Sequence, residues 1–345
     1  MLALVAGELL LRTCAPVRYR RPEGANEAHR SRWIHRASAV PGLSYELVPG
    51  ADRSDLGYRV RVNALGLRGP PTTLAKPDGV LRVAVVGDSV TFGVGVSDEE
   101  TWPAVLGRTL GPVLATEGLR CEVLNFGVTG YSSQDEARLI EGRVLAFAPD
   151  LVVVGYYLND PEHEPLQELH RQFHTPIWWE GSHLLRLASL RLRLWELHEL
   201  GGGDLFRLMH LERRSNWRSV LAAFDDIARA TGARGVPVLL VVLPTFLGHA
   251  DPAAPPRAEP GAIRFSTAWS DWAGYPYRAL HAQVAAAAER AGLDAFCALE
   301  AVSGAGFEPG ALRYDADHPN AVGHRLIGRA VARRILAERV ALLGR

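Results

Sequence analysis

The amino-acid sequence predicts an α/β protein in which helices cover both faces of a doubly wound parallel sheet of five strands, giving three layers (α/β/α). Short apolar runs rich in valine and leucine alternate with longer stretches whose apolar residues recur at helical spacing. The short runs lack regular polar alternation, which is typical of parallel strands buried on both faces. With 345 residues, 48% of them apolar, the chain is long enough for one large domain of this class.

Five segments carry the strand pattern: residues 81–87, 121–126, 150–156, 236–243 and 293–298. The helical stretches 215–231 and 277–291 are the crossovers between the later strands. A last helix is predicted over 320–340, with Asn320 as its N-cap. Its pattern interleaves an apolar set with basic residues: Val322, Leu326, Ile327, Val331 and Ile335 with Arg325, Arg329 and Arg333.

The organisation along the chain divides into three parts. Residues 1–16 are an apolar N-terminal segment, residues 17–80 are an extension and linker, and residues 81–345 form the main domain with an insertion at 161–214. Within the extension, Tyr58, Val60 and Val62 alternate with Arg59 and Arg61, which predicts a half-exposed strand.

The first twelve residues are apolar but contain Glu8 and are too short to cross a bilayer, which needs about 20 apolar residues. Three interpretations stay open: a helix that packs on the domain, an interfacial anchor, or the end of a longer membrane helix. Residues 1–12 therefore predict a possible peripheral membrane association.

The first chemical signal is the run Val83-Ala-Val-Val-Gly-Asp-Ser-Val90, in which a buried strand leads directly into a turn of small residues. Such a turn places its side chains at the carboxyl edge of a parallel sheet, where open α/β folds bind ligands. Ser89 is therefore the candidate nucleophile, and it requires a base and donors for an oxyanion.

The candidate base is His318 in the segment Tyr314-Asp-Ala-Asp-His-Pro-Asn320. Asp315 stands three residues earlier, so its carboxylate can accept the Nδ1 proton and leave Nε2 free to deprotonate the serine. Asp317 is the alternative, but its adjacency in sequence makes that geometry less favourable.

Two further strand ends supply candidate oxyanion donors. Gly130 follows the strand 121–126 and offers an unobstructed backbone N–H, while Ser133 and Glu136 have the spacing of a capping box. Asn159 follows the strand 150–156, where its side-chain amide can donate a hydrogen bond to developing negative charge without itself ionising.

These four blocks resemble, in order, those of the SGNH hydrolases, also called the GDSL esterase and lipase superfamily. The matching positions are Gly87-Asp88-Ser89, Gly130, Asn159-Asp160 and Asp315 with His318, and the resemblance spans residues 81–340. It implies a flavodoxin-like strand order of 2-1-3-4-5. It also implies that Ser89 attacks an ester carbonyl, with His318 as base, Asp315 as its orienter, and Ser89, Gly130 and Asn159 as the oxyanion hole.

The chain departs from the family where a glycine usually stands two residues before the asparagine, because it has Tyr157 there. We expect Tyr157 to narrow the acyl pocket. The insertion after Asn159-Asp160 contains Trp178 and Trp179, which predict either an aromatic lid that binds substrate or a helical subdomain that packs on itself.

Composition limits the partners. The 38 basic and 38 acidic residues cancel, so no nucleic-acid partner is indicated. His170 and His174 have helical spacing but lack an evident third ligand, so we predict no metal site and no cofactor. Cys14, Cys121 and Cys297 form no disulfide framework and leave the compartment open, with the bacterial envelope or a membrane favoured over the cytoplasm.

The sequence therefore predicts a serine hydrolase that cleaves carboxylic esters, of small molecules or carbohydrates, through an acyl-enzyme. Two alternatives stay open. A sugar hydroxyl rather than water could be the acceptor, or the substrate a sugar ester, giving an O-acetyltransferase or O-acetylesterase of the cell envelope. A noncatalytic glycan-binding protein on the same fold is the alternative of another class.

Overall fold

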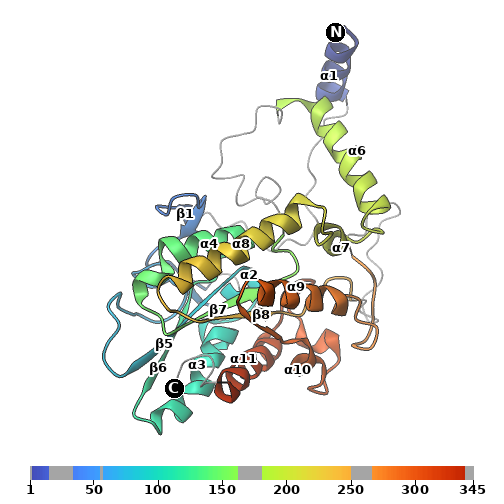
Figure 1. The fold of residues 1–345 in the computed structure, drawn as a ribbon. Coiled ribbons are helices and arrows are strands. Elements are labelled where there is room, and N and C mark those ends of the chain that lie inside the picture. Colours follow the sequence, from blue (N-terminus) through green and yellow to red (C-terminus); the bar gives the residue numbers. More distant parts are fainter. Residues whose placement is uncertain (1, 15–33, 55–56, 162–180, 250–265, 339–345) are drawn as a thin grey trace.

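The computed structural model describes residues 2–14, 34–54, 57–161, 181–249 and 266–338, and Figure 1 shows its fold. A five-stranded parallel sheet forms the centre. Its strands are β5 (Val80–Gly87), β6 (Arg120–Asn125), β7 (Leu151–Tyr156), β8 (Val238–Val242) and β9 (Asp294–Cys297). They lie in the order β6-β5-β7-β8-β9, which is 2-1-3-4-5 along the chain, so the expected topology is confirmed.

The middle strand β5 sets the register of the sheet. Val83 pairs with Val123 of β6 on one side and with Leu151 of β7 on the other. Every residue of β5, β7 and β8 is buried. This burial explains their continuous apolar sequences, because both faces of the strands are covered by helices.

The helices form two layers (Figure 1). On one face, α3 (Trp102–Ala115) packs against β6 and against α11 (Ala321–Ala337). On the other, α4 (Ser133–Gly142) packs against α8 (Ser215–Gly232), and α9 (Arg278–Arg290) packs against β8 and β9. The predicted three-layer α/β/α architecture is confirmed.

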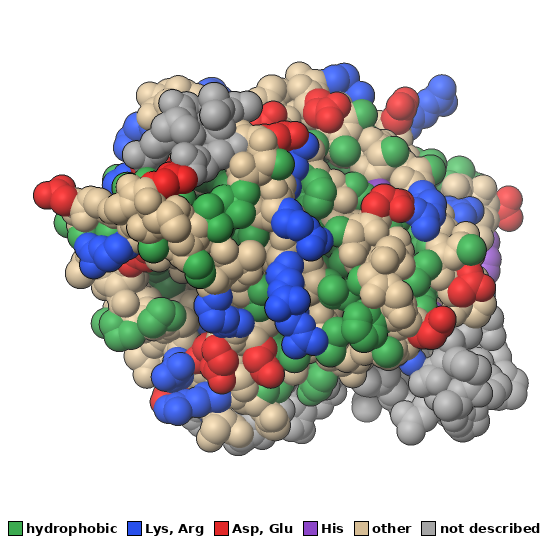
Figure 2. All heavy atoms as spheres, turned by 90° about the horizontal axis from the view of Figure 1, so that it is seen from below, with side chains coloured by type: hydrophobic (Ala, Val, Ile, Leu, Met, Phe, Trp, Pro, Cys, Tyr) green, Lys and Arg blue, Asp and Glu red, His purple; other side chains and the backbone are tan. Residues whose placement is uncertain are grey.

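Helix α11 has the amphipathic character that its sequence predicts. The Asn320 side chain accepts hydrogen bonds from the backbone N–H groups of Val322 and Gly323, so it is the N-cap. The three arginines at 325, 329 and 333 are exposed, whereas Ile327 and Val331 are buried. Figure 2 shows basic side chains forming a row on the face of the molecule seen from below.

The extension folds into two antiparallel pairs, β1 (His35–Ala37) with β2 (Tyr45–Leu47) and β3 (Asp52–Arg53) with β4 (Val60–Arg61). The alternation at residues 58–62 is confirmed: the tyrosine and two valines are buried, and the two arginines between them are exposed. The apolar side chains of the extension belong to the same hydrophobic core as the parallel sheet.

Two helices form an arm that projects from the body of the molecule (Figure 1). Helix α1 (Leu2–Cys14) packs against α6 (His183–Glu199) of the insertion, and α7 (Leu205–Met209) leads back to the domain. Among the described residues, no helix has the length and hydropathy needed to span a membrane.

The remaining short elements are α2 (Ser89–Phe92), η2 (Asp98–Glu100), η3 (Val144–Phe147), α10 (Leu299–Ser303) and η6 (Pro309–Leu312). One local prediction is wrong. The capping box of α4 is formed by Ser132 and Asp135, one residue before the expected pair Ser133 and Glu136. Both patterns satisfy the spacing rule, and Glu136 is instead fully buried.

Candidate active site

The strand β5 delivers Ser89 to the carboxyl edge of the sheet. Ser89 is the first residue of the four-residue helix α2, and Asp88 caps this helix by accepting a hydrogen bond from the Val90 N–H at 2.9 Å. The side chain of Ser89 is 5% exposed. The nucleophile candidate thus stands on a tight turn with its amide at the positive end of a helical turn.

His318 reaches this serine from the loop that precedes α11. Its Nε2 lies 2.9 Å from Ser89 Oγ, and its Nδ1 lies 2.9 Å from Asp315 Oδ1. A carboxylate cannot donate, so Nδ1 carries the proton and Nε2 accepts from the serine hydroxyl. The structure therefore joins the three predicted side chains in one continuous chain of hydrogen bonds.

The loop itself fixes Asp315. Its Oδ1 also accepts the backbone N–H groups of Asp317 (2.9 Å) and His318 (2.8 Å), so the carboxylate is held in the turn that presents the imidazole. Asp317, the alternative orienter, has no side-chain hydrogen bond to the imidazole in this arrangement, in which Asp315 bonds to Nδ1.

The electrostatics of the pair favour the charged acid and a basic imidazole. Burial lowers the pKa of His318, but the hydrogen bond and charge of Asp315, with the charges of Asp317 and Asp88, raise it above its ordinary value overall. Burial raises the pKa of Asp315, yet the hydrogen bonds from His318 and the Asp317 N–H lower it overall. Asp315 is therefore ionised across the neutral range.

The expected oxyanion donors lie on the loops that follow three neighbouring strands, β5, β6 and β7. Gly130 has φ of 79°, a conformation that favours glycine, and this places its N–H on the loop after β6. Within the described part of the chain, no backbone hydrogen bond uses the N–H of Ser89 or of Gly130.

Asn159, on the loop after β7, is half-buried, and its side chain hydrogen-bonds the carboxyl of Asp88. A primary amide has two N–H groups, so one remains for a ligand oxygen. Burial raises the pKa of Asp88 to about 6, although its hydrogen bonds from Val90, Ser89 and Asn159 act in the opposite direction.

Two more carboxyls are buried behind this edge. Glu136 in the first turn of α4 and Asp160 after β7 are 0% and 1% exposed. Burial raises the pKa of each well above its ordinary value. The charges of Asp88 and Asp135 raise the pKa of Glu136 further, and the charges of Glu136 and Asp88 raise that of Asp160. Burial therefore disfavours the ionised form of Asp160, whose Oδ2 accepts a hydrogen bond from the backbone N–H of Tyr157.

Tyr157 lies at the carboxyl end of β7 with its side chain buried. It is 1% exposed, and its hydroxyl donates to the carbonyl of Asp317 at 2.8 Å and contacts Thr245 Oγ1 at 2.6 Å. The side chain thus ties the end of β7 to the loop that carries His318, and the expectation that it narrows the acyl pocket stays a prediction. Sequence spacing placed Tyr157 at the correct edge but could not give its direction.

Trp178 and Trp179 lie outside the described residues, as do His170 and His174. A residue that the sequence reasoning missed is Asn125 at the end of β6. Its Nδ2 donates to the carbonyl of Thr91 at 3.1 Å and its Oδ1 accepts the Gly127 N–H at 2.9 Å. Its position at the carboxyl end of a strand was the available signal.

Comparisons with solved structures give distant likenesses. An acetylxylan esterase from Geobacillus stearothermophilus is 17% identical with a TM-score of 0.42, covering 74% of this chain and 93% of its own. LAE5, an alpha/beta hydrolase enzyme from the metagenome of Lake Arreo, is 18% identical with a TM-score of 0.43, covering 76% and 95%. TesA is 18% identical with a TM-score of 0.40, covering 74% and 97%. Likeness at this level says nothing about the substrate of this chain.

No curated protein matches the sequence. The model of the GDSL-like Lipase/Acylhydrolase family matches residues 85–326, which is more than half of the chain and includes Ser89, Gly130, Asn159, Asp315 and His318. These five positions are the same ones that the geometry gathers at the carboxyl edge of the sheet. This chain therefore belongs to the GDSL-like lipase/acylhydrolase family and is a hydrolase of ester bonds.

Proposed function

We propose that this enzyme hydrolyses carboxylic esters through an acyl-enzyme on Ser89, with His318 as general base and acid and Asp315 as its orienter. The observation that carries the proposal is the hydrogen-bonded chain from Ser89 Oγ through the imidazole to the Asp315 carboxylate. The serine and the histidine are 229 positions apart in sequence, so only the fold brings them within 2.9 Å.

The chemistry runs in two halves. Nε2 of His318 takes the Ser89 hydroxyl proton as Oγ bonds to the ester carbon, and the carbonyl oxygen becomes an oxyanion facing the N–H groups of Ser89, Gly130 and Asn159. Collapse breaks the bond to the alcohol oxygen, which receives the proton from Nε2. Water then repeats the sequence on the acyl-enzyme and regenerates the free serine.

The test is hydrolysis of p-nitrophenyl acetate and butyrate by the wild type and by Ser89→Ala, with intact-mass detection of a fluorophosphonate adduct. We expect turnover and labelling in the wild type and a loss of at least about 10³-fold in kcat in the variant. A folded wild type that neither turns over nor labels would overturn the proposal. The reaction is repeated with sugar acceptors present, and its products are identified. Free acetate indicates that water is the acceptor, and an acetylated sugar indicates a hydroxyl acceptor.

We also propose that the arm made by α1 and α6 holds the enzyme against a membrane surface. Twelve large apolar side chains of the described residues are exposed, and eight of them lie on these two helices or at the end of α6. The eight are Leu4, Val5, Leu9, Leu10, Leu185, Leu192, Trp195 and Leu200. A concentration of this kind on a projecting element is suited to the boundary between headgroups and acyl chains.

The two helices are joined by specific polar contacts. Glu8 of α1 accepts the backbone N–H groups of His183 (2.9 Å) and Leu184 (2.8 Å) and so caps the first turn of α6. These bonds, with those from Ser182 and Arg12, lower the pKa of Glu8 to about 2. Glu8, the charged residue that interrupts the apolar N-terminal segment, thus joins α1 to α6. The exposed leucines of the arm are left outside this contact. The exposed basic residue Arg191 on the same arm can contact anionic lipid headgroups.

The test is cosedimentation with vesicles of phosphatidylcholine and phosphatidylglycerol, comparing the wild type with a Leu9→Glu and Leu10→Glu double variant. Leu74→Glu is the matched control, because Leu74 is also exposed (49%) but lies in the linker before β5. We expect the double variant to lose binding by about tenfold or more and the control to keep it. Equal binding by all three proteins would overturn the proposal, as would a dimer that the double variant alone disrupts.

A further inference from the structure

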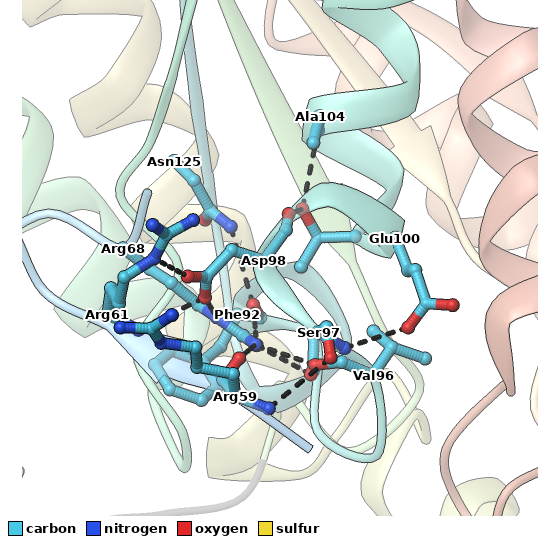
Figure 3. A network of polar contacts seen from close by, with 12 residues as sticks. Arg59, Arg61, Arg68, Phe92, Val96, Ser97, Asp98, Glu100, Ala104 and Asn125 are labelled. Carbon is cyan, nitrogen blue, oxygen red and sulfur yellow. Dashed lines mark hydrogen bonds and ion pairs between the residues drawn. The ribbon is translucent and has the colours of Figure 1, made fainter. Parts of the chain in front are cut away.

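The extension that precedes the catalytic domain contributes a buried arginine that contacts the end of the nucleophile helix α2. Arg68 is 3% exposed, and Figure 3 shows its guanidinium surrounded by acceptors. A guanidinium has five N–H groups, and here each can be assigned an acceptor. These are Asp98 Oδ1 (3.0 Å) for Nε, the carbonyls of Phe92 (2.7 Å) and Gly93 (2.6 Å) for Nη1, and those of Arg59 (3.2 Å) and Val96 (2.6 Å) for Nη2.

Three of those carbonyls lie at the end of the nucleophile helix or just beyond it. Helix α2 has only four residues, which is too few for a helix to be stable by itself. Its last carbonyl, that of Phe92, and its C-cap Gly93 (φ 99°) are both held by Arg68. A side chain at Gly93 would collide with Thr101 and approach the guanidinium, so this contact requires glycine. The carboxyl end of α2 is therefore fixed by the extension and by Asn125.

The same extension also holds the glycine loop of the oxyanion hole. The hydroxyl of Tyr45, in β2, donates a hydrogen bond to the carbonyl of Thr129 at 2.8 Å. The Nε2 atom of His35 lies 3.0 Å from the Thr129 hydroxyl. On the other side of Gly130, Tyr131 donates to the Tyr45 carbonyl at 2.5 Å. Both neighbours of Gly130 are thus bound to one residue of the extension, and Tyr45 is 0% exposed.

We propose that the N-terminal extension is part of the catalytic machinery, in which Arg68 positions Ser89 and Tyr45 positions Gly130. Neither side chain touches the reacting atoms, so both are positioning residues. The proposal rests on the proposed function, because it concerns the rate of acylation at Ser89. Its physical basis is that a displacement of about 1 Å between a nucleophile and its oxyanion donors can cost about 10²-fold in rate.

The experiment compares Arg68→Met with Arg82→Met. Arg82 is a matched control because it is also fully buried and ion-paired, to Glu122 at 2.7 Å, but lies near the amino end of β5. The kcat and KM for p-nitrophenyl acetate are measured at a temperature at which both variants are folded. The concentration of sites is taken from fluorophosphonate labelling, and unfolding midpoints are recorded alongside.

We expect both variants to unfold at lower temperature, but only Arg68→Met to lose kcat, by about 10- to 100-fold per labelled site, with KM within about twofold of wild type. Arg68→Lys keeps the charge beside Asp98 with fewer donors and should recover part of the rate. Equal kcat per site in the two methionine variants would overturn the positioning role while leaving the proposed function intact. A wild type without turnover or labelling would overturn both.

Tyr45→Phe supplies a second, milder test should Arg68→Met fail to fold. It removes one hydroxyl and keeps the ring, and we expect kcat to fall by about three- to tenfold and fluorophosphonate inactivation to slow in parallel. The control is Tyr277→Phe, which removes an equally buried hydroxyl bonded to Asp204 at 2.9 Å. Unchanged inactivation rates in Tyr45→Phe would contradict the role assigned to the extension at Gly130.

Discussion

The acidic side chains at the amino end of the parallel sheet differ in their partners from the three acids clustered behind Ser89 at its carboxyl end. At the amino end, acids are matched with bases: Arg82 pairs with Glu122 at 2.7 Å, and Lys76 pairs with Asp150 at 2.9 Å. At the carboxyl end, beside Ser89, three acids are gathered at Asp88, Glu136 and Asp160. Their burial raises the pKa of all three carboxyls.

Groups that contribute to stability thus lie at the amino end of the strands, and groups that affect reactivity lie at the carboxyl end of the same strands. Paired charges at the amino end join the linker and the loop before β7 to the sheet. Clustered acids at the carboxyl end disfavour their own ionisation, and the charge of Asp88 is among those that raise the pKa of His318. The carboxyls whose ionisation burial disfavours therefore lie on the side of the sheet that carries the candidate base His318.

The largest expected effect on kcat comes from substituting one carboxylate at each end of the sheet. Asp315→Asn removes the acceptor charge that fixes the Nδ1 proton, and we expect kcat to fall by about 10³- to 10⁴-fold. Asp150→Asn, at the amino end, removes the partner of Lys76 and should leave kcat within about twofold. Steady-state kinetics on p-nitrophenyl acetate measure both, and similar losses in the two variants would contradict the separation.

The pH profile gives the next largest effect. The base must be neutral to accept a proton, so activity should rise with pH, about tenfold per pH unit below the pKa of His318. Because that pKa is raised, the midpoint of kcat/KM should lie above the ordinary histidine value of about 6.5. Residual activity in Asp315→Asn should show a lower midpoint. A midpoint that stays in place would mean that Asp315 does not set the basicity of the imidazole.

The clustered acids should also affect stability. Glu136 has a folded-state pKa above its unfolded value, so the folded protein retains a proton that the unfolded chain releases, and stability falls as pH rises above about 4.3. Glu136→Gln removes this loss. We compare the free energy of unfolding of the variant with that of the wild type at each pH. The difference should favour the variant by about 1 kcal/mol or more at pH 8 relative to pH 4.5.

Urea unfolding at the two pH values checks this expectation, with Glu141→Gln as the control. Glu141 lies on the same helix, but its side chain is 60% exposed. The control should leave the pH dependence of unfolding unchanged. If Glu136→Gln behaves like the control, the carboxyl cluster does not carry the electrostatic cost that its burial indicates.

The smallest effect concerns the tie between β7 and the histidine loop. Tyr157→Phe removes the hydroxyl that donates to the Asp317 carbonyl, and we expect a loss of about 1 kcal/mol in stability and about threefold in kcat. Tyr156→Phe is the neighbouring control, because its buried hydroxyl contacts His210 Nε2 at 2.8 Å instead. Chemical denaturation and kinetics on both variants decide whether Tyr157 acts on the loop; equal kcat values would show that it does not.

Local pattern was sufficient for much of the fold. Each predicted strand lies within about two residues of an observed one, because burial on both faces requires continuous apolar runs. Ser89, His318 and Asp315 could be identified because each stands in a distinctive local context at a strand end or a helix entry. Tyr157 could not be placed, since the direction of its side chain depends on Thr245 and Asp317, which are distant in sequence.

The sequence by itself determined the order of strands and helices and the candidates for the reacting side chains, because these depend on periodicity, caps and short spacings. The tertiary structure alone decided that Glu8 caps α6, that Tyr157 holds the histidine loop, and that Arg68 reaches the nucleophile helix. The physical reason is that a polar side chain satisfies its hydrogen bonds with whichever groups the folded chain brings near. Those groups are fixed by packing, not by distance along the chain.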